Sequence, residues 1–320
     1  MKIAVAGMGV AGSTISSLLH DSGHDLSLFD PKSPGFYPPC GWAVNEREFC
    51  HLSQKIGLNG EDYVLSRADS IILSNSSRSI RLQSGGLCTI DKMRFLVDLA
   101  DGMAISRGRL SPREYDIVFD CTGISRAYIG QPREDFRMRA VEALVAGSQK
   151  KEFVFNYYPG GHGYSWSFPL GSNTHIGSGS DRTELNSFVL SLPNKIRLTG
   201  RDIRIRPLFD EAVSGNVVAV GESAGTVSPI TGEGILPSMR NAFLAVEKLD
   251  RHGREDFLKY YPRFLRESFG QYTDLFGLVR DARMGHLVRP ANLLKAGMAI
   301  KDLRSFGINA GIWKILKGLI

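Results

Sequence analysis

The stretch KIAVAGMGVAGSTISSLLHDSGHDLSLFD, residues 2–30, decides the fold of this 320-residue chain. Its apolar run at 2–6 predicts a buried parallel strand, and the pattern that follows the glycines predicts a helix to about His20. Residues 26–29 predict a second strand, and Asp30 stands at its end, 21 residues after Gly9. The stretch therefore predicts a βαβ unit with an acidic residue at the spacing that a nucleotide ribose requires.

Each glycine of the GMGVAG segment has a physical task in such a unit. Gly7 permits the tight turn, Gly9 lets the backbone approach a pyrophosphate, and Gly12 lets the helix pack closely on the strand. The helix N-terminus offers N–H groups and a positive dipole end to the phosphates. Asp30 can accept a hydrogen bond from a ribose 2′-hydroxyl, which disfavours NADP. The unit predicts dinucleotide binding and leaves NAD and FAD both open.

The rest of the chain predicts that this nucleotide domain is discontinuous. Residues 115–120 and 217–220 read as further buried strands, whereas residues 152–180 are β-rich with alternating aromatic side chains. We therefore expect the following division of the chain: 1–130 with 215–250 as the dinucleotide-binding domain, 131–214 as a β-rich substrate domain, and 251–320 as a C-terminal helical segment.

Composition narrows the class of protein. Hydrophobic residues make up 42% and charged residues 22%, which are globular values. Four scattered cysteines without a CxxC pair, and histidines without ligand spacing, predict a thiol-reduced, cytoplasmic protein with no metal site. No stretch reaches the roughly 18–20 apolar residues of a membrane-spanning helix. Six basic residues against one acid between 286 and 320 carry +5 of the net charge of +6. Nucleic-acid binding favours a basic face built into the fold, so no nucleic-acid partner is expected.

Five motifs in order resemble the geranylgeranyl reductase family, within the class of para-hydroxybenzoate-hydroxylase-like flavoproteins. The resemblance covers roughly residues 1–250 and rests on the following segments: GMGVAG with Asp30, Pro39-Cys40-Gly41, Thr122-Gly123-Ile124-Ser125, Tyr164-Ser165-Trp166-Ser167-Phe168-Pro169, and Gly221-Glu222 through Pro229 to Gly232-Glu233-Gly234-Ile235. Three positions depart from the family pattern. Glu222 replaces an Asp, Trp42 replaces a loop glycine, and Lys92 stands where an Arg is usual.

The resemblance implies an α/β fold: a glutathione-reductase-like FAD-binding Rossmann domain with a β-sheet substrate domain and C-terminal helices. FAD is the implied cofactor. The implied contacts to it are Gly7, Gly9, Val10, Ala11, Gly12, Asp30, Cys40, Gly41, Lys92, Thr122, Gly123, Gly221, Glu222, Pro229, Gly232, Gly234 and Ile235. The implied contacts to an isoprenoid lipid substrate are Trp42, Tyr164, Trp166, Phe168 and Pro169.

The implied reaction is saturation of C=C bonds in geranylgeranyl or polyprenyl groups by hydride transfer from reduced flavin N5. NAD(P)H or ferredoxin would supply the electrons. Cys40 is the candidate catalytic residue, because a protonated thiol beside the flavin can supply the proton that accompanies the hydride. The alternative for Cys40 is a small cysteine that only packs under the cofactor.

The aromatic side chains of Tyr164, Trp166 and Phe168 alternate, so on a strand they share one face. Such a face suits a prenyl chain, and it suits the core of a sheet equally well. Further along the chain, apolar residues recur at helical spacing beside Lys314 and Lys317, with Trp313 among them. The apolar stripe consists of Ile308, Ile312, Ile315, Leu316 and Leu319. This pattern favours peripheral contact with the inner face of the cell membrane; docking on the core or on a partner is the alternative.

Three rival functions stay open at this stage. The first is an FAD-dependent monooxygenase and the second a quinone-linked flavoprotein. The third belongs to another class, a non-catalytic prenyl-lipid-binding protein that keeps flavin structurally.

Overall fold

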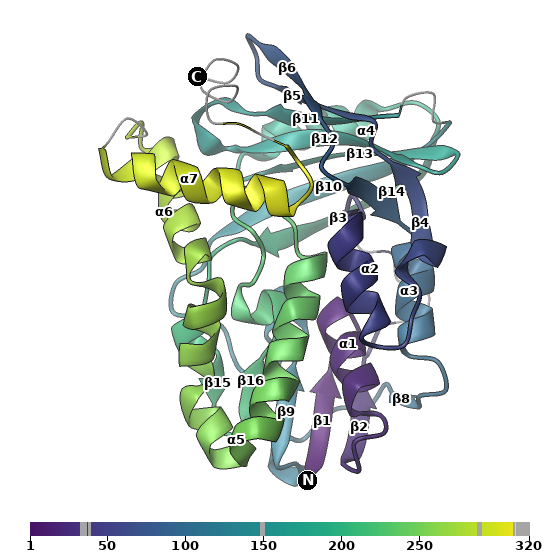
Figure 1. The fold of residues 1–320 in the computed structure, drawn as a ribbon, viewed down its shortest axis with the longest axis vertical. Coiled ribbons are helices and arrows are strands. Elements are labelled where there is room, and N and C mark those ends of the chain that lie inside the picture. The colour runs from purple at the N-terminus through teal and green to yellow at the C-terminus, as the bar shows by residue number, and fades with distance from the viewer. Residues whose placement is uncertain (33–36, 38–39, 148–150, 287–289, 310, 312–320) are drawn as a thin grey trace.

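The computed structural model of the chain describes residues 1–32, 37, 40–147, 151–286, 290–309 and 311, with the side chains of 290–294 left out. The described part is built on two large sheets (Figure 1). The first sheet has six strands in the order β15 (Val213–Ser214), β16 (Val217–Ala219), β9 (Ile117–Asp120), β1 (Lys2–Ala6), β2 (Asp25–Phe29) and β8 (Ile105–Ser106). All its neighbours are parallel except β15 and β16.

The second sheet has seven strands and is almost entirely antiparallel. Its order is β14 (Lys195–Arg204), β10 (Arg137–Ala146), β13 (Asn173–Ser180), β12 (Gly163–Leu170), β11 (Glu152–Tyr157), β5 (Ser70–Ser74) and β6 (Ser79–Gln83). Only β11 and β5 run parallel. The strands β5 and β6 come from inside the range 1–130, so that range contributes to both sheets.

A small third sheet and the helices pack around the two large sheets. The third sheet runs β3 (Ala43–Asn45), β7 (Leu87–Ile90) and β4 (Val64–Arg67). The helices are α1 (Val10–Leu19), α2 (Glu46–Gln54), α3 (Lys92–Leu99), α4 (Ser187–Ser191), α5 (Ile235–Phe269), α6 (Gln271–Arg283) and α7 (Pro290–Ser305). In Figure 1, α7 runs just below the seven-stranded sheet; the first part of α5 descends beside the six-stranded sheet, and its second part and α6 rise again toward α7.

The opening βαβ unit forms as predicted. Strand β1 is buried from Ile3 onward, and it lies between β2 and β9 at the centre of the six-stranded sheet. Ile3 and Val5 of this strand pack with α1 and α5 into the largest core cluster. Helix α5 contains a break at Gly253, where φ is +71°, and both of its halves pack into this same cluster.

One sequence prediction is wrong for Ile308. This residue was expected on a membrane-facing stripe, but its side chain is fully buried, packed among Leu82, Leu303 and Phe306. The remainder of that stripe, with Trp313, Lys314 and Lys317, lies outside the described residues. Within the described part of the chain, no helix is both long and apolar enough to cross a bilayer.

We predict that Gly12→Ala destabilises the protein by about 3 kcal/mol, against the usual gain from alanine in a helix. The reason is steric, since a Cβ at Gly12 would lie 1.9 Å from the Gly7 carbonyl oxygen. Urea unfolding measures the change. Gly9→Ala is the matched control, because no atom lies within 4 Å of a Cβ at Gly9. Equal stability of the two variants would contradict the close contact.

Candidate functional site

A cavity of about 1120 Å³ lies between the two large sheets and the C-terminal helices. This volume exceeds the roughly 300–1,000 Å³ usual for a small-molecule site, so the cavity can take a large ligand or two ligands together. Most residues expected at the site line it: Gly9, Val10, Ala11, Asp30, Cys40, Gly41, Trp42, Lys92, Thr122, Gly123, Tyr164, Trp166, Phe168, Glu222, Pro229, Gly232, Gly234 and Ile235. The residues expected at the site that do not line it are Gly7, Gly12, Pro169 and Gly221.

The glycine loop between β1 and α1 forms an open cradle. Gly7 has a φ of +90°, and a Cβ there would meet the Cys121 carbonyl at 2.6 Å. By contrast, Gly9 faces open space on the cavity side. The loop thus packs tightly where it meets the sheet and is empty where a phosphate would approach, which fits a dinucleotide diphosphate.

Asp30 supports the same loop from the end of β2. Its Oδ2 accepts the Met8 N–H at 2.8 Å, and its Oδ1 accepts the Lys32 N–H at 2.9 Å. The carboxylate also lines the cavity and keeps lone pairs for a ribose hydroxyl. Asp30 therefore has a structural task in addition to the expected contact with ribose.

Gly221 and Pro169, two of the expected site residues that do not line the cavity, make contacts behind its wall. A Cβ at Gly221 would lie 2.9 Å from the Ala11 Cβ, and the Gly221 N–H donates to Asn241 Oδ1 at 2.8 Å. The Pro169 carbonyl accepts the Thr89 hydroxyl at 2.6 Å. The first position joins α1 to the turn after β16, and the second joins β12 to the small sheet.

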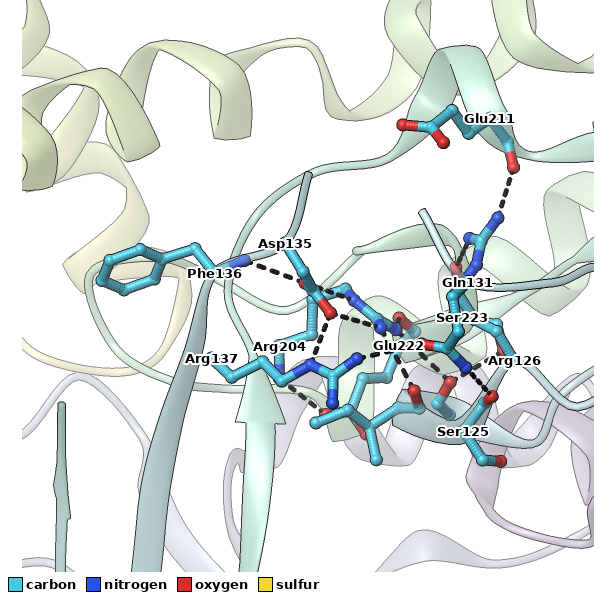
Figure 2. A network of polar contacts seen from close by, with 12 residues as sticks. Ser125, Arg126, Gln131, Asp135, Phe136, Arg137, Arg204, Glu211, Glu222 and Ser223 are labelled. Carbon is cyan, nitrogen blue, oxygen red and sulfur yellow. Dashed lines mark hydrogen bonds and ion pairs between the residues drawn. The ribbon is translucent and has the colours of Figure 1, made fainter. Parts of the chain in front are cut away.

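Glu222, in the turn after β16, connects the two large sheets (Figure 2). Its Oε1 accepts the Arg204 N–H at 2.9 Å, and its Oε2 accepts from the Arg201 guanidinium at 2.6 Å. Arg204 is completely buried and pairs with Asp135 at 2.8 Å. The guanidinium also donates to the Ile124 carbonyl at 3.1 Å. Both oxygens of Glu222 are therefore engaged in holding β14 over the turns that follow β9 and β16.

Basic side chains gather along the nucleotide side of the cavity. Lys32, Arg107 and Arg201 line it together with Lys92. The Arg201 Nε is buried and has no hydrogen-bond partner among the described residues, which suits an anionic ligand. Burial lowers the pKa of Lys32, and the charges of Arg201 and Lys92 add to that effect while Asp30 opposes it. Sequence reasoning missed Lys32, Arg107 and Arg201, because none belongs to a local motif.

Cys40, Gly41 and Trp42 form a loop on the cavity wall, which we call the Cys40 loop. A Cβ at Gly41 would lie 2.7 Å from the Phe168 ring, so glycine is needed for this close approach. Trp42 is buried and has a φ of +52°, in the left-handed region that bulky residues avoid. The preceding residue, Pro39, lies outside the described part of the chain.

The aromatic face on β12 forms as predicted. The ring centroids of Tyr164 and Trp166 are 5.8 Å apart, and those of Trp166 and Phe168 are 6.5 Å apart. Phe155 of β11 packs on this face, 4.9 Å from Phe168, and the Tyr164 hydroxyl donates to the Thr231 carbonyl. The face is thus both part of the sheet core and a wall of the cavity.

Helices α6 and α7 supply an apolar wall that the sequence analysis did not foresee. Its side chains share an aliphatic character and come from Leu278, Val279, Ala282, Ala296, Ala299, Ile300 and Leu303. The helical pattern of these segments was readable in the sequence, but nothing local to them pointed toward the cavity. The cavity therefore has a charged, glycine-rich part and an apolar part.

Two buried carboxyls lie where α5 begins. Glu233 is 7% exposed and lines the cavity, and burial raises its pKa to about 8. Asp302 of α7 accepts the Ser228 hydroxyl at 2.6 Å, and burial raises its pKa to about 6 despite that bond. Neither carboxyl belongs to a metal site, since no group of three or more suitable ligands occurs among the described residues.

We predict that Glu233→Gln flattens the dependence of stability on pH. The folded protein keeps the Glu233 proton up to about pH 8, whereas an ordinary carboxyl loses it near 4.5. Between these values the unfolded state binds fewer protons, so wild-type stability falls as pH rises, by up to about 1.4 kcal/mol per unit. The difference between the two urea-unfolding curves at pH 5 and pH 7.5 measures this contribution. Parallel curves would show that Glu233 is ionised in the folded protein.

Comparisons with known proteins agree with this architecture. No protein-family model matches the chain. Digeranylgeranylglycerophospholipid reductase 3 of Methanosphaera stadtmanae is 26% identical over 148 residues, a match that covers 40% of this chain and only 37% of that relative.

Solved structures match over almost the whole chain at low identity. A geranylgeranyl bacteriochlorophyll reductase-like protein of Thermoplasma acidophilum has a TM-score of 0.73 at 15% identity. The match covers 95% of this chain and 98% of the chain of that protein. The probable FAD-dependent monooxygenase PqsL of Pseudomonas aeruginosa gives 0.65 at 14% identity, with 93% and 99% covered. The flavin-dependent brominase Bmp2 gives 0.69 at 11% identity, with 93% of each chain covered. The resemblance read from the motifs is confirmed, and the chain has the α/β fold shared by these geranylgeranyl reductase-like and flavin-dependent proteins.

Proposed function

We propose that this protein is an FAD-dependent reductase that saturates C=C bonds in the geranylgeranyl or polyprenyl groups of an isoprenoid lipid. The observation that carries the proposal is a single cavity that reaches from the glycine cradle at Gly9 to the apolar wall of α6 and α7. Both named reductases among the similar proteins are in accord with it.

The charged part of the cavity suits FAD. Gly9 and the N-terminus of α1 would receive the diphosphate, Asp30 would meet the ribose, and Lys92 and Arg201 would neutralise phosphate charge. Bound FAD supplies two-electron redox chemistry at its isoalloxazine ring. The segment from Pro229 to Ile235 would line the ring, as the motif resemblance implies.

The first turn of α5 adds electrostatic support. This helix begins at Ile235, with Gly234 before it, and both residues line the cavity. The unpaired N–H groups and positive dipole end at a helix N-terminus stabilise negative charge. Cys40 lines the same cavity and is half-buried, so its thiol is the group we propose to protonate the substrate carbon.

The apolar part suits the lipid chain. Trp166 and Phe168 of β12 line this part together with aliphatic side chains of α7 such as Ile300 and Leu303. An isoprenoid chain buries only apolar surface, so its affinity grows with the length enclosed. An external electron donor, NAD(P)H or ferredoxin, and peripheral contact with the membrane remain parts of the proposal. We also propose that the chain divides into an FAD-binding domain, a β-rich substrate domain and a C-terminal helical segment.

A flavin monooxygenase is the second candidate function. The fold match to a probable FAD-dependent monooxygenase favours it, because the same architecture serves both kinds of chemistry. The two candidates differ in whether oxygen is needed for product.

We predict that Gly9→Ala lowers the affinity for FAD at least about tenfold, or about 1.4 kcal/mol. The added methyl would occupy space that is open in front of the cradle. Flavin fluorescence titration of the apoprotein measures the affinity. The unfolding free energy should stay within about 0.5 kcal/mol of wild type, because the methyl meets no protein atom. Unchanged FAD affinity would remove the cradle from the proposed site.

We predict that the reduced protein is reoxidised by a geranylgeranyl lipid in the absence of oxygen. The purified protein should show flavin bands near ~375 and ~450 nm, which bleach on dithionite reduction and return on adding the lipid. Mass spectrometry should find a lipid product heavier by two hydrogens per reduced bond. Reoxidation that occurs only with oxygen and yields a hydroxylated product would favour the monooxygenase. A protein that cannot be loaded with FAD would overturn both functions.

A further inference from the structure

Two buried ionisable side chains lie directly behind the Cys40 loop. Glu142 of β10 is 1% exposed and His175 of β13 is 0% exposed. Neither lines the cavity, and neither belongs to any motif in the sequence. Burying an ionisable side chain costs free energy unless it is hydrogen-bonded, so the groups that these two side chains contact identify what they support.

Glu142 binds the loop and the aromatic wall at the same time. Its Oε1 accepts the Cys40 N–H at 3.2 Å, and its Oε2 accepts the Trp166 indole N–H at 3.3 Å. The indole reaches Glu142 across the strand between them, because the residue in register with both is Gly177. A Cβ at Gly177 would lie 2.2 Å from the Trp166 ring. This arrangement across three strands is specific to a glycine at that position.

His175, on β13, supports the residues of the Cys40 loop from a second point. Its Nε2 is hydrogen-bonded to the Tyr37 hydroxyl at 2.5 Å and lies 3.8 Å from Glu142 Oε1. The Trp42 ring packs edge-on against the imidazole with centroids 5.0 Å apart, and Tyr37 packs on Trp42 at 4.8 Å. Trp42 is the residue with the left-handed backbone, a conformation that persists only where the surroundings hold it.

We infer that Glu142 and His175 form a clamp that holds the Cys40 loop in its strained shape at the cavity wall, with Glu142 as a positioning residue whose two oxygens tie the loop to the Trp166 indole. The use of this clamp in catalysis rests on the proposed function, in which Cys40 faces the flavin and the substrate. The clamp itself requires neither ligand.

Burial shifts the pKa of each ionisable side chain behind the Cys40 loop. Burial raises the pKa of Glu142 to about 8, although the bonds from Cys40 and Trp166 and the charge of Lys92 oppose the shift. Burial lowers the pKa of His175 to about 4, with the Gly41 carbonyl opposing that shift and Lys92 adding to it. Tyr37 faces Glu142, Cys40 and Arg197, and burial raises its pKa above the physiological range. Burial therefore favours the neutral form of both clamp groups, while the two N–H bonds that Glu142 accepts favour its carboxylate.

The experiment measures how fast iodoacetamide alkylates Cys40, with Cys50 of α2 as the control thiol in the same sample. Both cysteines are half-buried, and peptide mass spectrometry separates them. The substitution is Glu142→Gln, which keeps the shape but offers one acceptor oxygen to two N–H donors. One donor is then left unpaired, and an unpaired buried donor loosens its segment.

At pH 7 we expect the ratio of Cys40 to Cys50 alkylation to be about tenfold higher in Glu142→Gln than in wild type. Above pH 8 the difference between the two proteins should persist, because an ionised Glu142 accepts both N–H bonds at least as strongly as the neutral acid does. The ionisation of the thiols cancels when the two proteins are compared at each pH. Equal ratios at every pH would overturn the clamp.

A second measurement keeps the inference testable if the variant does not fold. Amide hydrogen exchange of the peptide containing the Cys40 loop is compared between wild type and Tyr37→Phe, which removes the hydroxyl bonded to His175 from a half-buried residue. Loss of protection by about tenfold in Tyr37→Phe supports the clamp, and unchanged protection overturns it. Neither measurement uses flavin or lipid, so a wrong proposed function and a wrong clamp give distinguishable results.

Discussion

The buried guanidinium of Arg204 is the constraint on which the cavity depends. An arginine without access to water is tolerated only when its donors are paired, and here they are shared among Asp135 and the carbonyls of the turns after β9 and β16. Those turns carry Gly123 and Glu222, which line the nucleotide side. This one side chain fixes the end of β14 over the carboxyl ends of two parallel strands and so ties one sheet to the other (Figure 2).

The glycine loop could be predicted from the sequence because its physics is local. The turn at Gly7, the close packing at Gly12 and the acid at position 30 all lie within one βαβ unit, and the structure has them as the spacing implied. The Cys40 loop was predictable only as a resemblance. Its support comes from Glu142 and His175, whose roles are created by strand register more than a hundred residues away along the chain.

The aromatic alternation on β12 shows a different limit of sequence reasoning. Period-two aromatic residues indicate a face, but they do not say whether the face is buried in the core or open to a ligand. In the structure the face belongs both to the core and to the cavity. Trp166 and Phe168 are almost fully buried by their neighbours and still line the cavity with their remaining surface. The wall of α6 and α7 could not be predicted because its role depends on where those helices are placed.

The contribution of β5 and β6 to the second sheet has a consequence for how the chain folds. Synthesis alternates between the sheets: β1 and β2 belong to the first, β5 and β6 to the second, β8 and β9 to the first, β10–β14 to the second, and β15 and β16 to the first again. The seven-stranded sheet has all its strands once β14 ends at Arg204, whereas the six-stranded sheet waits for β15 and β16, which end at Ala219. Contacts so distant in sequence form late and together. Because the strands of the two sheets are interleaved along the chain, a single cut cannot separate one complete sheet from the other.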